Sequence, residues 1–478
     1  MLVVAVVYLF FPGNNLFSED SIAYANNVKY GESLFWPHHL LYSAFNYCLY
    51  IPFKQIIHSL DAFRFMQLVN GISGLLCLCV FNKIVMKLTG DKKWANTWTF
   101  FVACCFGVIR FSVEIETYIQ PLFFSLLSSL FFLKYQNTCK MYYVVFCSLT
   151  ASIACLFHQI HLFWGIGLFV GFILYGRWKP VVVYALPTLS VLVVYSLVMV
   201  FYNDIPFSCS NLTTYLLDYY YSEKADISFG VSNVLLTGIS FFRTFFQVHG
   251  IIIDVLRLIP FFWIVIPVVL ILLGVGVYHL KGFRFKPVHL MENRFELTHL
   301  IIFFLQFSFA FFSDGNAEFM VMLPFLIPLF IPCLFDFNLK AVPYISVALL
   351  IWNFCFSVYP NHHFDYFNNR HLLQIIDQHP NKAFILMQRN VIVEQYYYET
   401  GKYEDFRLIH ADSEEDITRL RSENRIFYTD VLTKKMPFNR AQFIQVHNYD
   451  NLHFRKRIKK IYTDLGAFYI DEISPEVR

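Results

Sequence analysis

The chain has 478 residues, of which 57% are hydrophobic, 19% aromatic and only 15% charged, and its formal net charge is +3 at pH 7. An ordinary soluble domain is closer to one quarter charged, so this composition excludes that class. The apolar residues come in blocks near the length of about 20 residues that spans a bilayer, which indicates a polytopic membrane protein. The small net charge gives no sign of a nucleic-acid partner.

The first apolar run covers residues 1–11 and has about half the length that a membrane span needs. It also lacks the basic flank of a signal peptide. We therefore expect the natural chain to start upstream of Met1; a short, tilted helix end is the alternative.

The rest of the membrane part alternates polar connections with apolar blocks. A polar stretch covers residues 12–37, and a half-apolar helix is predicted from about residue 38 to 53. The apolar blocks that follow lie near 63–86, 94–110, 116–133, 141–157, 160–176, 180–202, 251–280, 297–312, 318–335 and 341–358. With the first run, they predict about eleven transmembrane helices.

Basic connections fix the orientation, because cytoplasmic loops are enriched in Lys and Arg. Four connections are basic, at 83–93, 134–140, 177–179 and 281–294. If residues 38–53 span the membrane, these connections share a side with Glu19 and Asp20. If residues 38–53 lie along the interface, they take the opposite side, as the rule requires. Pro37 and Pro52 favour the interfacial arrangement, which places the polar candidates below on the outer side.

The composition changes after residue 360, where the chain becomes richer in charged residues and contains no cysteine. Strands are predicted at 382–388, 406–410 and 425–430, with helices at 391–401 and 413–424 between them. This alternation predicts a small α/β domain with a mostly parallel sheet, and no Gly-rich phosphate loop accompanies it. We expect a mainly α, polytopic membrane domain over 1–360, with two interfacial helices in an outer catalytic loop over 12–61, and a soluble α/β domain over 361–478.

Two adjacent acids, Glu19 and Asp20, open the first predicted interfacial helix. They can simply cap it, since a carboxylate at a helix N-terminus contributes about 0.3–1 kcal/mol. One acid would suffice for a cap, so the pair also fits a general base at the water–lipid boundary. Asp20 is the stronger candidate because it begins the helical segment 20–31, with Glu19 as substitute or helper.

Three further motifs carry charged or titratable groups. In the segment 110–121, Arg110, Glu114 and Glu116 either pair with one another or line a polar cavity. His158 and His161 lie three residues apart, which fits a hydrogen-bonded turn, half of a metal site or a contact to phosphate. In the segment 313–324, Asp314, Gly315 and Asn316 suit a tight turn, whereas Glu318, at the head of the next helix, is not explained by the turn.

Together, these motifs resemble the GT-C superfamily of membrane glycosyltransferases, in its bacterial protein O-mannosyltransferase-like and lipid A aminoarabinose-transferase-like branch. The segment 19–31 resembles the family's first interfacial helix, with Asp20 at the position of the catalytic acid. The segment 36–42 (WPHHLLY) resembles the opening of the second, although Pro-His-His replaces His-Pro-Pro. The segments 114–118 and 315–324 resemble the acidic-x-Tyr start of a spanning helix and the entry to a late helix.

The resemblance implies inverting transfer of a hexose or pentose from a polyprenyl-phosphate donor to a protein, lipid or glycan acceptor. The reaction would take place on the periplasmic or extracellular side of the bacterial inner membrane. Asp20 would deprotonate the acceptor hydroxyl, and the leaving phosphate would need a cation from Arg110, Arg243 or a divalent metal ion, between which the sequence does not choose. The residues expected to bind substrate are His38, His39, Tyr42, Arg110, Glu114, Glu116, Tyr118, His158, His161, Asn316 and Glu318.

Two other functions fit a membrane protein of this kind. A transporter or flippase of a lipid-linked precursor would need polar groups near the bilayer midplane and repeat symmetry, and the sequence contains neither. A membrane O-acyltransferase using His158 or His161 would need its acid–base residue deeper in the bilayer. The sequence therefore favours glycosyl transfer as the predicted function.

Overall fold

The computed structural model describes residues 1–14, 18–221, 229–248, 251–281, 284–285, 293–336, 338–403, 407–410, 413, 426–433 and 452–475. Contacts divide the chain into two compact units. The membrane unit comprises Met1–Pro12, Gly31–Val248 and Phe261–Tyr359, and the C-terminal unit comprises Gly13–Tyr30, His249–Pro260 and Pro360–Arg478. Residues 13–30, which we expected within the outer loop of the membrane domain, thus group with the C-terminal unit.

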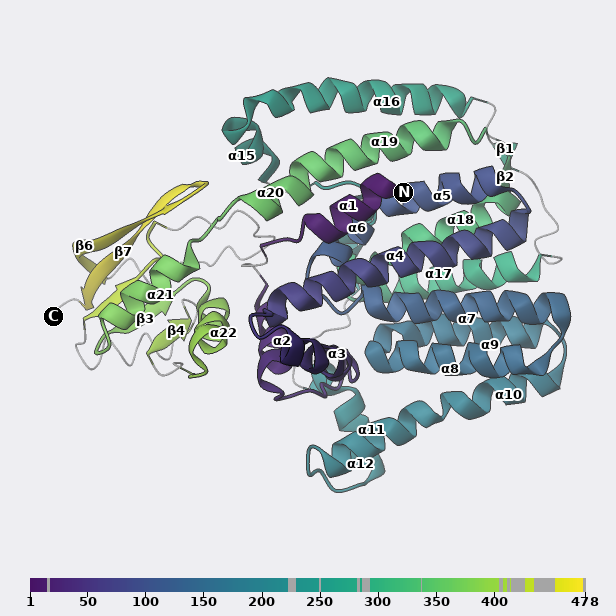
Figure 1. The fold of residues 1–478 in the computed structure, drawn as a ribbon, viewed down its shortest axis with the longest axis horizontal. Helices are drawn as coiled ribbons and strands as arrows, with labels where there is room; N and C mark the ends of the chain where they lie inside the picture. Colours follow the sequence, from purple (N-terminus) through teal and green to yellow (C-terminus); the bar gives the residue numbers. More distant parts are fainter. Residues whose placement is uncertain are drawn as a thin grey trace. The chain divides into compact units, whose positions relative to one another are not determined.

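The membrane unit is built almost entirely of helices (Figure 1). Its short 3-10 helices are η1 (Gln159–His161), η2 (Pro260–Ile264) and η3 (Ala317–Met320), and a π-helical turn η4 (Phe354–Val358) follows its last long helix. The α-helices are α1 (Leu2–Phe10), α3 (Tyr42–Ile56), α4 (Ala62–Thr89), α5 (Lys92–Cys104), α6 (Phe106–Val113), α7 (Ile119–Thr138), α8 (Met141–Phe157), α9 (Leu162–Leu174), α10 (Trp178–Thr188), α11 (Ser190–Phe201), α12 (Cys209–Leu216), α13 (Asp218–Tyr221), α14 (Val231–Phe245), α16 (Val265–His279), α17 (Arg294–Phe312), α18 (Leu323–Leu334) and α19 (Ala341–Asn353). The two-residue strands β1 (Arg284–Phe285) and β2 (Phe335–Asp336) pair antiparallel.

Among the described residues, five helices are long and apolar enough to cross a membrane. They are Ala62–Thr89, Trp178–Phe201, Pro260–His279, Arg294–Phe312 and Ala341–His363; α5 and α6, bent by 66°, make a sixth if counted as one span. Three more apolar helices, Met141–Phe157, Gln159–Leu174 and Leu323–Leu334, are shorter. Several predicted blocks are therefore short or broken helices. Helix α3, with 15 residues and an internal Pro52, is in neither group.

Two parts of the sequence prediction change here. The block 251–280 is divided, because the amphipathic helix α15 (Ile251–Leu258), with Asp254 and Arg257 paired at 3.3 Å, belongs to the C-terminal unit. Helix α14 was not assigned from the sequence at all. It packs against α6, α17 and η3.

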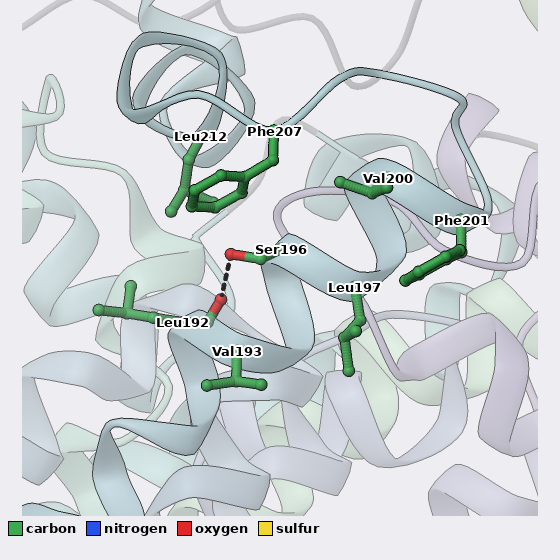
Figure 2. Close-up of a pocket in the computed structure, with 8 residues that line it drawn as sticks. All are labelled: Leu192, Val193, Ser196, Leu197, Val200, Phe201, Phe207 and Leu212. Carbon is green, nitrogen blue, oxygen red and sulfur yellow. Dashed lines mark hydrogen bonds between the residues drawn. The ribbon is translucent and has the colours of Figure 1, made fainter.

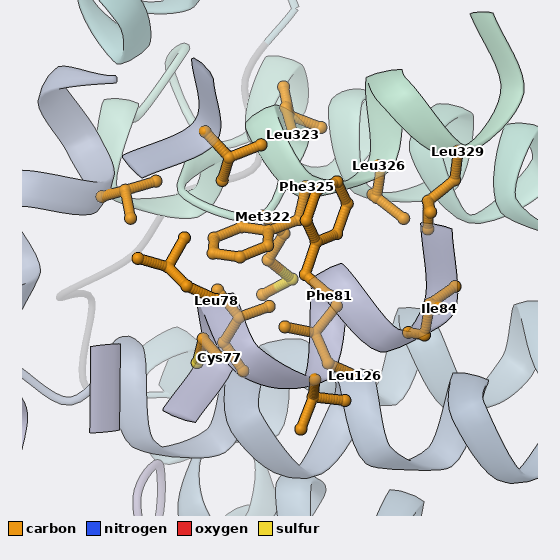
Figure 3. Close-up of a cluster of buried hydrophobic side chains, with 14 of the residues drawn as sticks. Cys77, Leu78, Phe81, Ile84, Leu126, Met322, Leu323, Phe325, Leu326 and Leu329 are labelled. Atoms are coloured by element: carbon orange, nitrogen blue, oxygen red, sulfur yellow. The ribbon is translucent and has the colours of Figure 1, made fainter. Parts of the chain in front are cut away.

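The centre of the membrane unit is a cluster of interlocking side chains from α4, α7 and α18 (Figure 3). Phe81 of α4 and Phe325 of α18 meet edge to face, with ring centroids 5.6 Å apart. Leu126 of α7 packs into the same cluster. Because lipid tails are as apolar as these side chains, close packing rather than removal from water holds the helices together.

The break between α5 and α6 is stabilised by side chains from distant helices. Tyr8 donates its hydroxyl to the carbonyl oxygen of Ala103 at 2.9 Å, and the amide of Asn353 donates to that of Cys104 at 2.9 Å. Carbonyl groups released by a helix break in apolar surroundings need such partners. The break redirects the chain into α6, whose last turn carries Arg110.

The C-terminal unit contains a five-stranded sheet in the order β4-β3-β5-β7-β6. Strand β3 pairs parallel with β4 and β5, whereas β7 pairs antiparallel with β5 and β6. The strands are β3 (Ala383–Leu386), β4 (Leu408–His410), β5 (Phe427–Thr429), β6 (Leu452–Thr463) and β7 (Gly466–Pro475), and the helices are α2 (Glu19–Tyr30), α15, α20 (Tyr359–His363, which begins in the membrane unit), α21 (Asn369–Gln378) and α22 (Arg389–Thr400).

The predicted strands at 382–388, 406–410 and 425–430 and the predicted helix at 391–401 are confirmed. The helix predicted at 413–424 lies outside the described residues, apart from Ser413. The expectation of a mostly parallel sheet is wrong, because the hairpin β6–β7 adds two antiparallel pairings. The alternation of strands and helices by itself could not reveal a hairpin that follows it.

Candidate functional site

The turn between α6 and α7 carries a cluster of charged groups that joins two of the predicted motifs. The Nε of Arg110 lies 2.8 Å from Oε2 of Glu114, and its Nη2 lies 3.8 Å from Oε1 of Glu318. Tyr118 donates its hydroxyl to Oε2 of Glu318 at 3.0 Å. The side chains of Arg110, Glu114 and Glu318 are 21%, 14% and 33% exposed, so water reaches the cluster but does not surround it. We call these four residues the Arg110 cluster.

A tight turn ahead of η3 places Glu318 in this cluster. The backbone N–H of Glu318 donates to Oδ1 of Asn316 at 3.0 Å, and Asp314 and Gly315 both have positive φ angles, 55° and 63°. Helix α14 supports the turn, because the amide of Asn233 donates to Oδ1 of Asp314 at 3.3 Å. Asn316, expected to bind substrate, uses its side-chain oxygen within the turn.

A network of buried side-chain amides, from Asn46, Asn70 and Gln120, supports the α6–α7 turn. The amide of Asn70 on α4 donates to the carbonyl oxygens of Glu114 at 2.8 Å and Glu116 at 3.0 Å. Gln120 donates to Oδ1 of Asn70 at 2.8 Å and exchanges hydrogen bonds of 3.2 and 3.3 Å with Asn46 of α3. The network therefore fixes the backbone of the turn and binds α3 to α4 and α7. Neither the network nor its amides were identified from the sequence.

Two predicted substrate-binding residues belong to this buried layer. The side chain of Tyr42 is fully buried, and its hydroxyl accepts a hydrogen bond of 3.4 Å from Asn70. Glu116 is 6% exposed. Asn70 donates to the hydroxyl of Tyr42 and to the backbone carbonyl oxygen of Glu116, so both residues belong to the support of the α6–α7 turn.

Three histidine rings form a row that begins at the ring of Tyr118 in the Arg110 cluster. The ring of His158 stacks on Tyr118 with centroids 5.1 Å apart, His39 stacks on His158 at 6.0 Å, and His38 follows His39 at 6.3 Å. The loop that carries His38 and His39 is bound to Gln159, whose backbone N–H donates to the carbonyl oxygen of His38 at 3.0 Å. The structure thus brings the WPHH motif, the FHQIH motif and the α6–α7 turn together.

Two of these histidines, His39 and His158, are neutral at physiological pH. Burial, and then the neighbouring His158 and His38, lower the pKa of His39 well below its usual value. Burial, followed by His38, lowers the pKa of His158 to about 3. A neutral imidazole accepts or donates hydrogen bonds without charge, so the rings of His39 and His158 add no positive charge beside Arg110.

The backbone N–H of His161 donates to the carbonyl oxygen of His158 at 3.1 Å, but its ring contacts α7. The Nδ1 of His161 is 2.7 Å from the hydroxyl oxygen of Ser125, and the residue is 1% exposed. The guanidinium of Arg243, on α14, lies 5.8 Å from the ring centre of Phe106. Across the described residues, no group of three or more His, Cys, Asp or Glu side chains is arranged to hold a metal ion.

Glu19 and Asp20 begin α2 in the C-terminal unit. Both are exposed. The hydroxyl oxygen of Ser18 accepts the backbone N–H of Ser21 at 3.3 Å, so a serine rather than an acid caps the helix. The Oε2 of Glu19 accepts a hydrogen bond of 3.0 Å from the amide of Asn390. Neither acid is the capping residue, although both lie in the first turn of α2, where a carboxylate is stabilised by the helix dipole.

An apolar groove of about 460 Å³ lies between α11 and the segment that leads into α12 (Figure 2). The hydroxyl of Ser196 is occupied by a hydrogen bond of 2.8 Å to the carbonyl oxygen of Leu192. The remaining lining is hydrocarbon, from Val193, Leu197, Val200, Phe201, Phe207 and Leu212. Because α11 completes the candidate span Trp178–Phe201, the groove suits a lipid chain, and none of the predicted site residues lines it.

Comparisons with known proteins identify the fold. No family model matches the chain, and no curated protein matches it in sequence. ArnT from Cupriavidus metallidurans bound to undecaprenyl phosphate is similar in structure, with a TM-score of 0.53 and 12% identity over 98% of this chain and 96% of that one. The Archaeoglobus fulgidus oligosaccharyltransferase in complex with Zn and sulfate gives 0.53 and 12% over 98% and 72%.

The Archaeoglobus fulgidus oligosaccharyltransferase AglB in complex with an inhibitory peptide and a dolichol-phosphate is similar too, with a TM-score of 0.51 and 12% identity over 90% of this chain and 69% of that one. The helical membrane unit and the small C-terminal sheet match this architecture. The chain has the fold of the GT-C membrane glycosyltransferases.

Proposed function

We propose that this protein is an integral membrane glycosyltransferase that moves a sugar from a polyprenyl-phosphate donor to an acceptor hydroxyl. The observation that carries the proposal is the Arg110 cluster, on a fold shared with ArnT bound to undecaprenyl phosphate. AglB in complex with dolichol-phosphate supports the same class of donor. The active site would lie on the extracytoplasmic side, as the positions of the basic connections predict.

Arg110 would bind the phosphate that leaves with the lipid. Its Nε is held by Glu114, and the terminal nitrogens of the guanidinium retain N–H donors that fit phosphate oxygens. Its two carboxylate neighbours prevent the guanidinium from swinging out of place. The charge that develops on the departing phosphate oxygen would then meet a preorganised cation.

Asp20 would act as the general base. In a single displacement, its carboxylate takes the proton of the acceptor hydroxyl while the acceptor oxygen forms a bond to the anomeric carbon. The bond from that carbon to the phosphate oxygen breaks, and polyprenyl phosphate leaves. The configuration at the anomeric carbon is inverted, for a hexose or a pentose alike.

Release of sugar from a radiolabelled polyprenyl-phosphate donor in proteoliposomes tests this proposal. Asp20→Asn keeps the size of the side chain but not its basicity, so transfer should fall by about 10²–10⁴-fold. Asp377→Asn, at an exposed acid on α21 of the same unit, is the matched control and should match the wild type. Full activity of a folded Asp20→Asn variant would refute the assigned base.

A further inference from the structure

Helix α2, which carries Asp20, packs along its length against α22 of the same C-terminal unit (Figure 1). At its start, the amide of Asn390 donates to Oε2 of Glu19 at 3.0 Å. In its middle, the amide of Asn26 donates to Oε2 of Glu394 at 2.7 Å and to the carbonyl oxygen of Glu394 at 2.9 Å. Asn26 is 2% exposed, so these bonds are shielded from water.

The end of α2 is bound as firmly as its start. The hydroxyl of Tyr30 lies 3.0 Å from the carbonyl oxygens of Tyr397 and Tyr398, and the rings of Tyr30 and Tyr397 are 4.8 Å apart. The ammonium group of Lys29 donates to the carbonyl oxygen of Tyr398 and lies 4.3 Å from the centre of its ring. The partners follow the same order along both helices, so α2 and α22 run parallel.

The spacing of these contacts separates the two acids. Glu19, Asn26 and Tyr30 recur at intervals of seven and four residues, which places them on one face of α2. Asp20 follows Glu19 by one residue, which turns it by about 100° around the helix axis. The face bound to α22 therefore includes Glu19, while exposed Asp20 lies on another face.

We propose that α22 holds α2 in the position that presents Asp20 to the substrates, with Glu394 and Asn26 as positioning residues and Glu19 as a docking group. The inference rests on the function proposed above. It assigns the adjacent acids different roles: Glu19 accepts a hydrogen bond from α22, and Asp20 accepts the proton. The same proposal gives the C-terminal unit a role in catalysis. Removal of α22 would then reduce turnover even for an acceptor that the C-terminal unit does not bind.

Substitutions that keep or remove a hydrogen-bond acceptor test this role. Glu394→Ala removes the side-chain acceptor for Asn26 and leaves only the backbone carbonyl oxygen. The value of kcat should then fall by about 10- to 100-fold, since a displacement of about 1 Å in a reacting group can have such an effect. The KM for the donor should stay within about twofold, because a displaced base does not change donor binding. Glu394→Gln retains an acceptor oxygen and should restore most of kcat. Glu399→Ala, at an α22 residue that binds Gln395 instead, is the matched control.

Glu19 gives an independent test at an exposed position. A docking group tolerates Glu19→Gln, whose amide oxygen still accepts from Asn390, and loses turnover in Glu19→Ala. A base would lose turnover equally in both variants. Equal losses at Glu19, or a Glu394→Ala variant with the kcat of the wild type, would overturn the positioning role while Asp20→Asn remains inactive. An active Asp20→Asn variant would instead overturn the proposed function.

Discussion

Arg110→Gln removes the cation that Glu114 and Glu318 share. Deleting one partner of a fully buried ion pair costs about 3–5 kcal/mol, because the other charge remains buried. Here the side chains of Arg110 and Glu114 are 21% and 14% exposed. Screening by water at this exposure reduces the expected loss to about 2 kcal/mol, or about a 30-fold lower ratio of folded to unfolded protein.

The double variant Arg110→Gln/Glu114→Gln separates stability from chemistry. Two amides replace the ion pair, so the midpoint of thermal unfolding in detergent should return to near that of the wild type. Transfer should stay about 10²–10³-fold low, because the cation that faces the leaving phosphate is still absent. Recovery of transfer together with stability would show that Arg110 serves only to neutralise Glu114, and would refute its phosphate role.

Three further perturbations follow from the packing and the buried polar groups. Gly171→Ala should destabilise the protein by about 1–3 kcal/mol, because a Cβ there would lie 2.6 Å from a side-chain oxygen of α17. Gly274→Ala, in α16 with nothing within 4 Å, should not lower the unfolding midpoint, because Ala favours a helix over Gly. Equal midpoints for the two variants would argue against close contact of α9 and α17. Asn70→Ala leaves two carbonyl oxygens of the α6–α7 turn without their donor, at about 1–3 kcal/mol each, so both the midpoint and the transfer rate should drop, and a fall in neither would contradict the amide network. Burial lowers the pKa of His158 to about 3 in the folded state, against about 6.5 when unfolded, so the unfolded state binds the proton first and stability declines below about pH 6.5 by at most about 1.4 kcal/mol per pH unit. His158→Gln should flatten that decline in midpoints measured from pH 7 to 5, and an unchanged slope would exclude His158 as its source.

The sequence located most of the charged and histidine motifs of the site but not their partners. Arg110 and Glu114 are four residues apart, so their pairing follows from helical spacing. The addition of Glu318 depends on how η3 packs against α6, α14 and α17, and Tyr118 and Glu318 are separated by 200 residues. No periodicity in the chain encodes a contact at that distance.

Groups without a motif were missed for a related reason. Asn70 and Gln120 lie in largely apolar helices without a recognisable motif, and only their meeting in the folded bundle gives them a role. Helix α14 cannot be recognised from an apolar stripe, because its buried face consists of Asn233, Thr237, Ser240 and Thr244. In the tail, strands and helices could be predicted from their alternation, whereas the docking of α2 on α22 joins Asn26 and Glu394 across 368 residues.

The break between α5 and α6 has a consequence for biogenesis. The amide of Asn353 donates to the carbonyl oxygens of Cys104 and Phe245, and its own oxygen accepts the backbone N–H of Gln247 at 2.9 Å. This side chain is synthesised 249 residues after Cys104. Until α19 leaves the ribosome and enters the bilayer, the end of α5 lacks that donor, so the nascent half-helix needs water, lipid headgroups or an insertion factor at the break. Folding of the segment that carries Arg110 is therefore a late event, completed only when α19 is in place.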